Sequence, residues 1–344
     1  MKVLIDGSFV EKKPTGVGRF CWEVLKHITK YTDGVEWYIA IPNSTDDTKL
    51  KEIDNLTIIK EGKKNNKKWQ LLTLGKIAKK MGAYVLGMAN FTPLFKKDFI
   101  ILHDVTYLDK EGQSAFLWSL KYRIIERFGM YKHKNILTVS EFSKGRIKFH
   151  YKKYPLDKIV VIGNAGDHWD GVESVRPSFY DDSEYFLSVS STTKNKNFKY
   201  VVELAKKNPT KNFIIVGRID NNLDALVGDV KNLKFTGYIS NEELRYLYEH
   251  CKAFILPSLY EGFGMPPLEA LYCGTKCLIL SNIDVFKETY GDNVNYCNPY
   301  DYENLISLDD LKNVPDEKIK EIFDKYNWNV VSKRIYDAII KYNK

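Results

Sequence analysis

The sequence lacks the features that define several classes of protein. Its 344 residues contain no apolar run approaching the roughly 18–20 residues that a membrane-spanning helix needs. The five cysteines are scattered and include no Cys-x-x-Cys pair, which argues against a disulfide framework and a zinc site and favours reduced thiols in the cytoplasm. The first apolar run is broken at Asp6 and Gly7, so we interpret it as a buried strand rather than a secretory signal.

Several chemical motifs are missing as well. No Asp-x-Asp occurs, and no His/Cys/Asp cluster has the spacing of metal ligands, so we assign no metal site and expect no cofactor. The absence of Gly-x4-Gly-Lys-Ser/Thr excludes an ATP-hydrolysing P-loop. No aromatic-basic RNA motif or helix-turn-helix pattern is present, and nucleic acid is therefore not an expected partner.

The charge of the chain is unevenly distributed. The formal net charge is +8, and all of the excess lies in residues 1–170, which hold 30 Lys and Arg against 19 Asp and Glu. A basic half attracts nucleic acid, anionic membrane or phosphorylated small molecules, and charge alone does not select among them. The composition is that of a globular chain, 44% hydrophobic and 14% aromatic, and its length suits two domains.

Short apolar runs alternate with longer amphipathic stretches along the whole chain. This alternation is typical of βα units and predicts an α/β fold with two doubly wound parallel sheets. We expect strands at Lys2–Ile5, Glu36–Ile41, Leu56–Ile59, Tyr84–Gly87, Phe99–Leu102, Asn135–Val139, Ile159–Ile162, Tyr185–Val189, Asn212–Val216, Leu233–Thr236, Ala253–Leu256 and Lys276–Leu280. We expect helices at Gly18–Thr29, Trp69–Met81, Ala115–Lys132, Glu141–Phe149, Phe198–Lys206, Glu242–His250, Pro266–Cys273 and Val285–Tyr290.

A stretch without periodicity, Asp167–Ser183, separates the two sets of strands and contains glycine, proline and paired acids. We therefore expect one Rossmann-like domain over residues 1–170 and a second over 171–326. The amphipathic stretch Asn327–Tyr342 is predicted to form a helix that packs back on the first domain. The carboxyl ends of such sheets are where ligands bind.

The strongest chemical motif is LPSLYEGFGMPPLEA at residues 256–270. An apolar strand leads into a loop, and Pro266 and Pro267 then open a helix, a position where proline is tolerated. Gly262 and Gly264 allow a ligand to approach the backbone closely, and the helix N-terminus beside them favours a diphosphate.

Two carboxylates frame this loop at a spacing of eight residues. Glu261 lies in the loop and Glu269 about one turn into the helix, so each can accept a hydrogen bond from a hydroxyl of a ribose or a sugar that flanks the diphosphate. For Glu269 alone, an ordinary capped helix start that complements the macrodipole is the simpler interpretation. The combination of two glutamates, two glycines and two prolines favours a binding site.

The motif resembles the Glu-x7-Glu motif of the retaining GT-B glycosyltransferases of family 4. Its flanking segments extend the similarity, and matching pieces precede it in order: PTGVGRF at 14–20, HD at 103–104, LTVSEFSK at 137–144 and VIGNAGD at 161–167. The resemblance covers nearly the whole chain. It implies two facing Rossmann-like domains with a central cleft, the first binding an acceptor and the second a nucleotide-sugar.

The resemblance also implies roles for single residues of the second domain. Glu269 would bind the ribose hydroxyls, and Glu261 would contact the donor sugar as a catalytic residue. Lys196 would hold the diphosphate and stabilise it as it leaves, since a leaving diphosphate needs cationic stabilisation when no metal is present. The backbone that would share this work comprises Gly262, Phe263, Gly264 and Met265.

The loop Ser190–Asn197, SSTTKNKN, departs from the family's usual form. That form resembles Gly-Ser-Leu-x-Pro-Arg-Lys-Asn; here Lys196 matches the lysine, whereas Asn195 replaces the arginine and Ser190 the glycine. Lys194 can supply the second cation from two residues earlier. The alternative for Lys194 is a lysine in a solvated loop, and the two interpretations stand about equal.

In the first half, PTGVGRF follows the first strand and precedes a helix. Gly16, Val17 and Gly18 can bring backbone N–H groups to an anion, although an ordinary tight turn is the better explanation of the glycines when the motif is taken alone. By the resemblance, this loop faces the donor diphosphate and the acceptor. His103 follows a strand directly, and the match to the family's His-Asp implies that it hydrogen-bonds the donor sugar or its reacting region; Asp104 is the weaker candidate.

The segment Lys60–Lys80 holds eight lysines with Trp69 and several leucines among them. A cationic amphipathic helix bearing a tryptophan is typical of a membrane-surface element. The alternative is a solvated loop followed by an ordinary helix buried in the domain. The positive charge of the whole half favours contact with an anionic membrane, with Trp69 entering the interface.

Together these observations predict a retaining, metal-independent hexosyltransferase of cell-surface polysaccharide assembly. Its donor is a nucleotide-sugar, with GDP-mannose favoured and UDP- or dTDP-sugars as alternatives, and its acceptor is a glycan or a lipid-linked glycan. We expect it in the cytoplasm, at the inner face of the membrane. The alternative is a nucleotide- or sugar-binding protein that keeps the fold without catalysis; the departures at Ser190 and Asn195 are its support.

Overall fold

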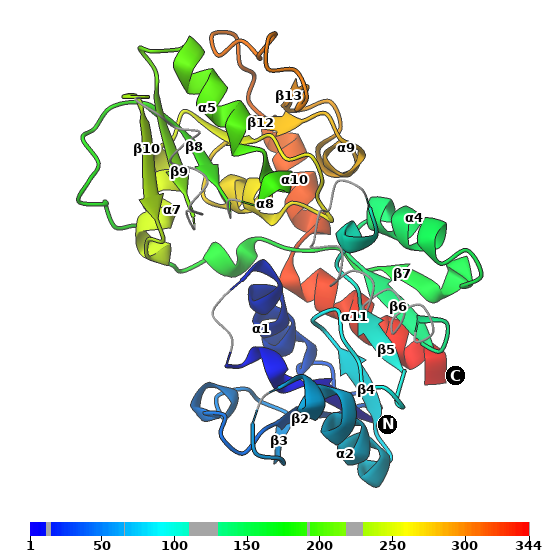
Figure 1. The fold of residues 1–344 in the computed structure, drawn as a ribbon. Helices are drawn as coiled ribbons and strands as arrows, with labels where there is room; N and C mark the ends of the chain where they lie inside the picture. Colours follow the sequence, from blue (N-terminus) through cyan, green and yellow to red (C-terminus); the bar gives the residue numbers. More distant parts are fainter. Residues whose placement is uncertain (12–14, 65, 110–129, 191–192, 218–229, 344) are drawn as a thin grey trace. The chain divides into compact units, whose positions relative to one another are not determined.

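The computed structural model describes the chain except for residues 12–14, 65, 110–129, 191–192, 218–229 and 344. The described residues form two compact units (Figure 1). The first contains Met1–Leu108, residues 130–164 and the C-terminal stretch that begins at Trp328. The second contains Ala165–Asn327, together with Asp109. Within the described part of the chain, no helix is both long enough and apolar enough to cross a bilayer.

The described residues of the first unit build a seven-stranded sheet in which every pairing is parallel. Its order is β3-β2-β1-β4-β5-β6-β7. The strands are β1 (Lys2–Asp6), β2 (Glu36–Ile41), β3 (Leu56–Lys60), β4 (Tyr84–Gly87), β5 (Phe99–Ile101), β6 (Asn135–Thr138) and β7 (Ile159–Val161). The central strands β1, β4 and β5 are buried except at the first residue of β1 and of β4, as a parallel sheet covered on both faces requires.

Four α-helices of the first unit are described: α1 (Gly16–Ile28), α2 (Leu74–Met81), α4 (Glu141–His150) and α11 (Trp328–Asn343). A single turn of π-helix, Trp69–Thr73, precedes α2, and short 3-10 turns lie at Gly7–Phe9, Thr48–Leu50, Thr106–Leu108 and Leu156–Lys158. The C-terminal helix α11 packs against α1, with the rings of Trp328 and Phe20 5.6 Å apart. Arg334 of α11 also donates a hydrogen bond to the carbonyl oxygen of Ile162.

The second unit repeats this design with a six-stranded parallel sheet in the order β10-β9-β8-β11-β12-β13. The strands are β8 (Tyr185–Val189), β9 (Asn212–Val216), β10 (Leu233–Gly237), β11 (Ala253–Leu256), β12 (Leu278–Ser281) and β13 (Asn295–Cys297). The described helices are α5 (Phe198–Lys207), α7 (Asn241–His250), α8 (Met265–Tyr272), α9 (Asp284–Tyr290) and α10 (Asp316–Lys325), with 3-10 turns η6 (Asp167–Trp169) and η7 (Lys194–Lys196).

In each sheet the chain adds strands first on one side of the first strand and then on the other side. In the first sheet β1 lies between β2 and β4, and in the second β8 lies between β9 and β11. Ligands of doubly wound sheets bind at the carboxyl ends of the strands where the order reverses. In the second unit, candidate residues follow both strands: Lys194 and Lys196 come after β8, and Glu261 comes after β11.

The two doubly wound sheets confirm the predicted α/β class, and each predicted strand begins and ends within two residues of its observed bounds. β13 and α10 were not predicted from the sequence. The helix predicted at Ala115–Lys132 lies almost wholly outside the described residues. The N-terminal part of the first unit ends at Asn164 rather than at residue 170, because η6 packs on α8 of the second unit.

Candidate active site

The loop between β11 and α8 has a conformation that depends on glycine. Gly264 caps α8 with a φ of +84°, and a Cβ atom there would lie 2.4 Å from the ring of Phe286. Pro266 and Pro267 occupy the first turn of α8, as predicted, and lack the N–H groups that would otherwise point out of the helix end. The loop is therefore held tightly against α9.

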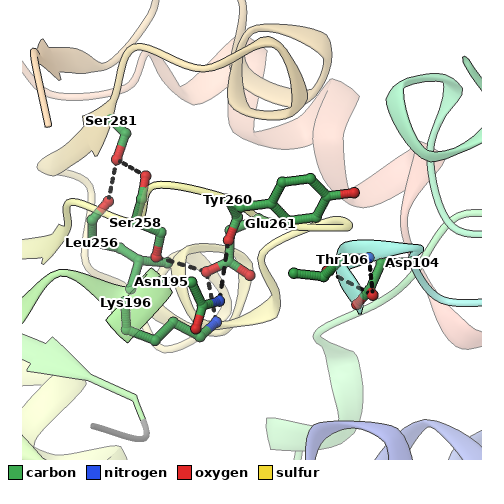
Figure 2. A network of polar contacts seen from close by, with 9 residues as sticks. All are labelled: Asp104, Thr106, Asn195, Lys196, Leu256, Ser258, Tyr260, Glu261 and Ser281. Atoms are coloured by element: carbon green, nitrogen blue, oxygen red, sulfur yellow. Dashed lines mark hydrogen bonds and ion pairs between the residues drawn. The ribbon is translucent and has the colours of Figure 1, made fainter. Parts of the chain in front are cut away.

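Glu261 is the centre of a buried polar network after β11 (Figure 2). Its Oε1 atom accepts hydrogen bonds from Lys196 Nζ at 2.6 Å and from Ser258 Oγ at 2.7 Å. Ser281, at the end of β12, donates to the carbonyl oxygen of Ser258 at 2.6 Å. The side chains of Lys196 and Glu261 are 18% and 9% exposed, so the ion pair is largely shielded from solvent.

The loop after β8 is clamped onto the loop after β11. The carbonyl oxygen of Asn195 accepts from the N–H of Leu259 at 2.7 Å. Asn197 adopts a left-handed conformation, and its side-chain amide donates to the carbonyl oxygens of Pro257 and Pro299. These bonds place Lys196 beside Glu261. Lys194, on the same 3-10 turn, is exposed.

Glu269 lies on α8 and is 8% exposed. His168 Nε2 lies 3.2 Å from Glu269 Oε1, and the hydroxyl of Tyr248 donates to Glu269 Oε2 at 3.3 Å. His168 comes from η6 and Tyr248 from α7, so three segments distant in sequence converge on this carboxylate. Sequence reasoning missed both partners, although His168 directly follows the VIGNAGD match that carried part of the resemblance.

In the first unit, His103 follows β5 and is buried. Its Nε2 donates to the carbonyl oxygen of Met88 at 2.9 Å, and its ring meets the Phe20 ring edge-on at a centroid distance of 4.6 Å. Burial lowers the pKa of His103, an effect that the bond to Met88 and the charge of Asp104 only partly offset. The imidazole is therefore neutral near pH 7, with a lone pair on Nδ1.

Asp104 has a local structural role. Its carboxylate accepts from the N–H and the hydroxyl of Thr106, at 3.0 and 2.7 Å, and so closes the turn after β5 (Figure 2). This arrangement agrees with its place as the weaker member of the His-Asp pair.

The glycines of PTGVGRF form the start of α1 rather than a separate tight turn; Pro14 lies outside the described residues. Gly16 and Val17 are the first helical residues, and Thr15 caps the helix by accepting from the N–H of Gly18 at 3.1 Å. The cap already uses the Gly18 donor. The N–H groups of Gly16 and Val17 are the remaining candidates for an anion at this helix end.

The membrane interpretation of Lys60–Lys80 was wrong in one respect. Trp69 is 3% exposed, packs in a buried cluster that includes Leu4 and Ile77, and donates its indole N–H to the carbonyl oxygen of Glu61 at 2.7 Å. It cannot enter a lipid interface without unfolding this part of the unit. The exposed cations of the segment are all eight of its lysines: Lys60, Lys63, Lys64, Lys67, Lys68, Lys76, Lys79 and Lys80.

The second unit thus brings Glu261 and Lys196 into direct contact and holds Glu269 on the helix that follows the same loop, whereas the first unit joins His103 to α1 through Phe20. Among the residues that the structure describes, no group of three or more His, Cys, Asp or Glu side chains is arranged to hold a metal ion. Two Rossmann-like sheets, each with candidate residues at or near its strand ends, define the GT-B fold class.

Comparisons with known proteins agree with this class. The family model described as glycosyl transferases group 1 matches residues 173–308. The O-antigen chain mannosyltransferase RfbU of Salmonella typhimurium is 30% identical over 257 residues, covering 71% of this chain and 67% of RfbU. O-antigen chain mannosyltransferase B of Escherichia coli is 28% identical over 207 residues, covering 55% of this chain and 54% of that protein. The chain belongs to the group 1 glycosyl transferases.

A solved structure shows the same fold over almost the full chain. Sucrose-phosphate synthase from Thermosynechococcus elongatus superposes with a TM-score of 0.74 at 14% sequence identity, covering 99% of this chain and 98% of that one. At this identity the likeness concerns the fold. The chain is thus a GT-B glycosyltransferase of the group that its Glu-x7-Glu motif indicates.

Proposed function

We propose that the chain transfers a hexose from a nucleotide-sugar to a hydroxyl of a glycan or lipid-linked glycan, with retention of anomeric configuration and without a metal ion. The observation that carries this proposal is the placement of Lys196, Glu261 and Glu269 around the loops that follow β8 and β11, where a doubly wound sheet binds its ligand. Two buried carboxylates and one cation suit a ligand with hydroxyls on both sides of a diphosphate.

Each residue has a distinct role in this proposal. Glu269 accepts hydrogen bonds from the ribose, and Glu261 contacts the donor sugar. Lys196 holds the diphosphate together with the backbone from Gly262 to Met265. As the glycosidic bond breaks, negative charge grows on the leaving diphosphate, and a fixed cation stabilises that state more than the ground state.

The contact between Lys196 and Glu261 fits the order of groups along a nucleotide-sugar. The diphosphate and the sugar are neighbours in the donor, so the residues that bind them have to be neighbours too. In the structure the ammonium group of Lys196 and the carboxylate of Glu261 neutralise each other at 2.6 Å. A bound diphosphate would compete with Glu261 for the ammonium group and leave the carboxylate to the sugar hydroxyls.

Mannose is the favoured sugar and GDP-mannose the favoured donor. The support is the similarity to two proteins named as O-antigen chain mannosyltransferases, of which the chain spans about two thirds and about half. In the first unit, the neutral His103 can accept a hydrogen bond at Nδ1 from a hydroxyl of the donor sugar, while Gly16 and Val17 offer backbone N–H groups to the diphosphate or the acceptor.

The acceptor is proposed to be lipid-linked and used at the inner face of an anionic membrane. The exposed lysines of Lys60–Lys80 supply the attraction to lipid headgroups. Beside them, a groove of about 590 Å³ is lined by apolar and cationic side chains, among them Leu72, Phe95, Lys76 and Lys96. Phe95 is 89% exposed and replaces Trp69 as the aromatic side chain available to an interface.

A panel of nucleotides tests the proposal and its alternative. Thermal shift with GDP, UDP and dTDP and their sugars identifies the donor, because a ligand at a hundred times its dissociation constant stabilises the fold by about 2.7 kcal/mol. Release of nucleoside diphosphate from the selected donor, unchanged by EDTA, supports a metal-independent enzyme. Binding without any release supports the non-catalytic alternative, and complete inactivation by EDTA contradicts the metal-independent mechanism.

A further inference from the structure

The loop that follows β4 turns back onto the end of β5. A Cβ atom on Gly87, the last residue of β4, would lie 1.9 Å from the carbonyl oxygen of Phe91, so the turn requires a glycine. Asn90 has a left-handed backbone with a φ of +59°, and its N–H group donates to the carbonyl oxygen of Ile101 at 3.2 Å. The loop is thus attached to the strand that leads to His103.

The same loop holds His103 at two points. The Oδ1 atom of Asn90 accepts a hydrogen bond from the His103 N–H group at 2.7 Å, and the carbonyl oxygen of Met88 lies 2.9 Å from His103 Nε2. A carbonyl oxygen can only accept, so Nε2 carries the proton in this contact. One contact fixes the main chain and the other fixes the ring, and together they orient the imidazole.

The bond to Met88 determines what the other ring nitrogen of His103 can do. A neutral imidazole has a single N–H group, and when that group is on Nε2, the Nδ1 atom is an acceptor only. None of the side chains or N–H groups that the structure describes donates to Nδ1. This atom suits a partner that brings its own hydrogen, such as a hydroxyl, and it does not suit an anion.

The groups that touch His103 bring little charge. Phe20 of α1 meets its ring edge-on, and the hydroxyl of Ser143 of α4 donates to its carbonyl oxygen at 3.3 Å. Of the described residues, Asp104 is the one whose charge acts on the imidazole, and it raises the pKa less than burial lowers it. Asn90 adds an uncharged amide. A carboxylate in its place would make the same bond and tolerate the same backbone, but would add a second negative charge near the ring.

We propose that Asn90 is a positioning residue for His103: it fixes the main chain from which the imidazole projects, and as an amide it leaves Nδ1 unprotonated to accept a hydroxyl of the substrate. The inference rests on the proposed contact between His103 and the donor sugar. It deepens that proposal because it restricts the partner of Nδ1 to a hydrogen-bond donor. It also assigns this restriction to a residue outside the Glu-x7-Glu motif and the His-Asp pair.

Two substitutions at position 90 separate the hydrogen bond from the charge. Asn90→Gly removes the acceptor but tolerates the left-handed backbone, whereas Asn90→Asp keeps the acceptor and adds a charge. Asn55 has the same φ of +59° at an exposed position directly before β3, so Asn55→Asp is the matched control. Release of GDP from GDP-mannose is measured from about pH 5 to about pH 9. A UDP- or dTDP-sugar replaces GDP-mannose if the thermal-shift panel selects one.

The shape of the pH profile distinguishes the two variants. In Asn90→Asp the added charge favours the imidazolium, whose Nδ1–H group cannot accept, so the loss of turnover on acidification should begin about one pH unit higher than in the wild-type protein. Asn90→Gly should lower kcat about tenfold at every pH without moving the profile, because the ring loses its fixed orientation. Asn55→Asp should match the wild type. A merely structural role would leave the profile of Asn90→Asp unchanged, since that variant keeps the hydrogen bond.

The protonation of His103 can also be measured without substrate. Long-range proton–nitrogen correlation spectra of protein labelled at its histidine nitrogens show which nitrogen of each imidazole carries the proton, and His103→Gln identifies the signals of His103. The wild-type protein is expected to show Nε2–H at neutral pH. Nδ1 should take up a proton at higher pH in Asn90→Asp than in the wild type. GDP-mannose should shift the Nδ1 signal more than the Nε2 signal.

Each contrary result has a separate meaning. An Nδ1–H form in the wild type at neutral pH, or an unchanged titration of His103 in Asn90→Asp, would overturn the positioning role, as would wild-type kinetics in both Asn90 variants. If no sugar nucleotide is bound or turned over, the proposed function fails, while the spectra still decide whether Asn90 sets the state of His103. If the donor is turned over but leaves the Nδ1 signal unchanged, His103 does not accept from the substrate, and the inference is wrong although glycosyl transfer stands.

Discussion

The two units share a doubly wound parallel sheet but differ in the electrical character of their candidate residues. The second unit buries two carboxylates and joins one of them to a lysine, so formal charges lie at its ligand edge. The first unit, which belongs to the basic half of the sequence, buries a neutral imidazole, and the capped start of its helix α1 is exposed. A dense run of its exposed lysines, in the segment Lys60–Lys80, lies on and before α2 instead. The comparison teaches that the net charge of a unit reports on its exposed surface. A candidate ligand site is indicated instead by the charged side chains that are shielded from solvent.

Removal of the Lys196 cation, which is largely shielded from solvent, is expected to have the largest effect. Lys196→Ala should lower kcat about 100-fold, because the leaving diphosphate loses its cation, while KM for the donor changes less. Steady-state kinetics with the donor identified above measures both constants. Lys206→Ala, which removes an exposed lysine from α5, is the matched control and should leave both unchanged.

Lys194→Ala is measured in the same kinetic experiment. A fall in kcat comparable to that of Lys196→Ala would show that Lys194 replaces the arginine of the family motif. A loss of donor affinity with unchanged kcat in Lys196→Ala would contradict its role in the transition state.

Glu269→Ala is expected to weaken binding of nucleoside diphosphate by about 10- to 30-fold, because hydrogen bonds to a charged acceptor are lost. The helix keeps its prolines and its glycine cap, so the thermal unfolding temperature without ligand should change little. Calorimetric titration measures the affinity, and Glu317→Ala, at an exposed position of α10, is the control. Wild-type affinity in Glu269→Ala would show that the ribose is bound elsewhere.

Two glycine-to-alanine substitutions compare the tightly packed loop of the site with an ordinary helix. Gly264→Ala should lower the free energy of unfolding by about 1–3 kcal/mol, since alanine tolerates a φ of +84° poorly and its Cβ would meet Phe286. Gly145→Ala, in α4, meets nothing within 4 Å and should stabilise by up to about 1 kcal/mol. Urea denaturation measures both, and equal effects would contradict the strained loop.

The smallest effect concerns the surface charge of the first unit. Replacing Lys63, Lys64, Lys67 and Lys68 with serine should reduce co-sedimentation with anionic vesicles at low salt and leave nucleotide binding unchanged. Salt should weaken the wild-type interaction, because the Debye length falls from about 10 Å at 0.1 M to about 3 Å at 1 M. The control variant removes the same charge from exposed positions of the second unit: Lys199, Lys206, Lys231 and Lys320. Wild-type protein that stays in the supernatant would favour a soluble acceptor.

The parts of the fold that follow local periodicity could be predicted from the sequence. The buried strands β2 and β8 were found at their exact bounds because continuous apolar runs are punctuated by polar loops. The short strand β13 carries only three residues, Asn295–Cys297, and its buried asparagine hides the pattern. Helix α10 buries only Ile322 fully, so its sequence resembles a solvated stretch.

The site residues that stand close together in the sequence could be predicted, whereas residues that packing brings together from distant segments could not. Glu261, Gly264 and Glu269 stand in one motif, whereas His168 reaches Glu269 only because η6 packs on α8. Trp69 is the opposite case, a residue predicted to lie at the surface that packing buries. The lysines beside it in the sequence led to the prediction of a surface residue, but its indole packs in a hydrophobic cluster on the sheet. Periodicity describes one helix at a time and carries no information about the surface that a particular side chain meets.

The packing of α11 on α1 has a consequence for synthesis. Trp328, Ile335 and Ile339 are fully buried, and they belong to the unit whose first helix ends at Ile28. A ribosome that adds roughly 5–20 residues per second needs between about 15 and 60 s to make the intervening chain. Throughout that time the apolar face of α1 has no permanent cover, so the nascent first unit is expected to depend on chaperones until the last helix emerges.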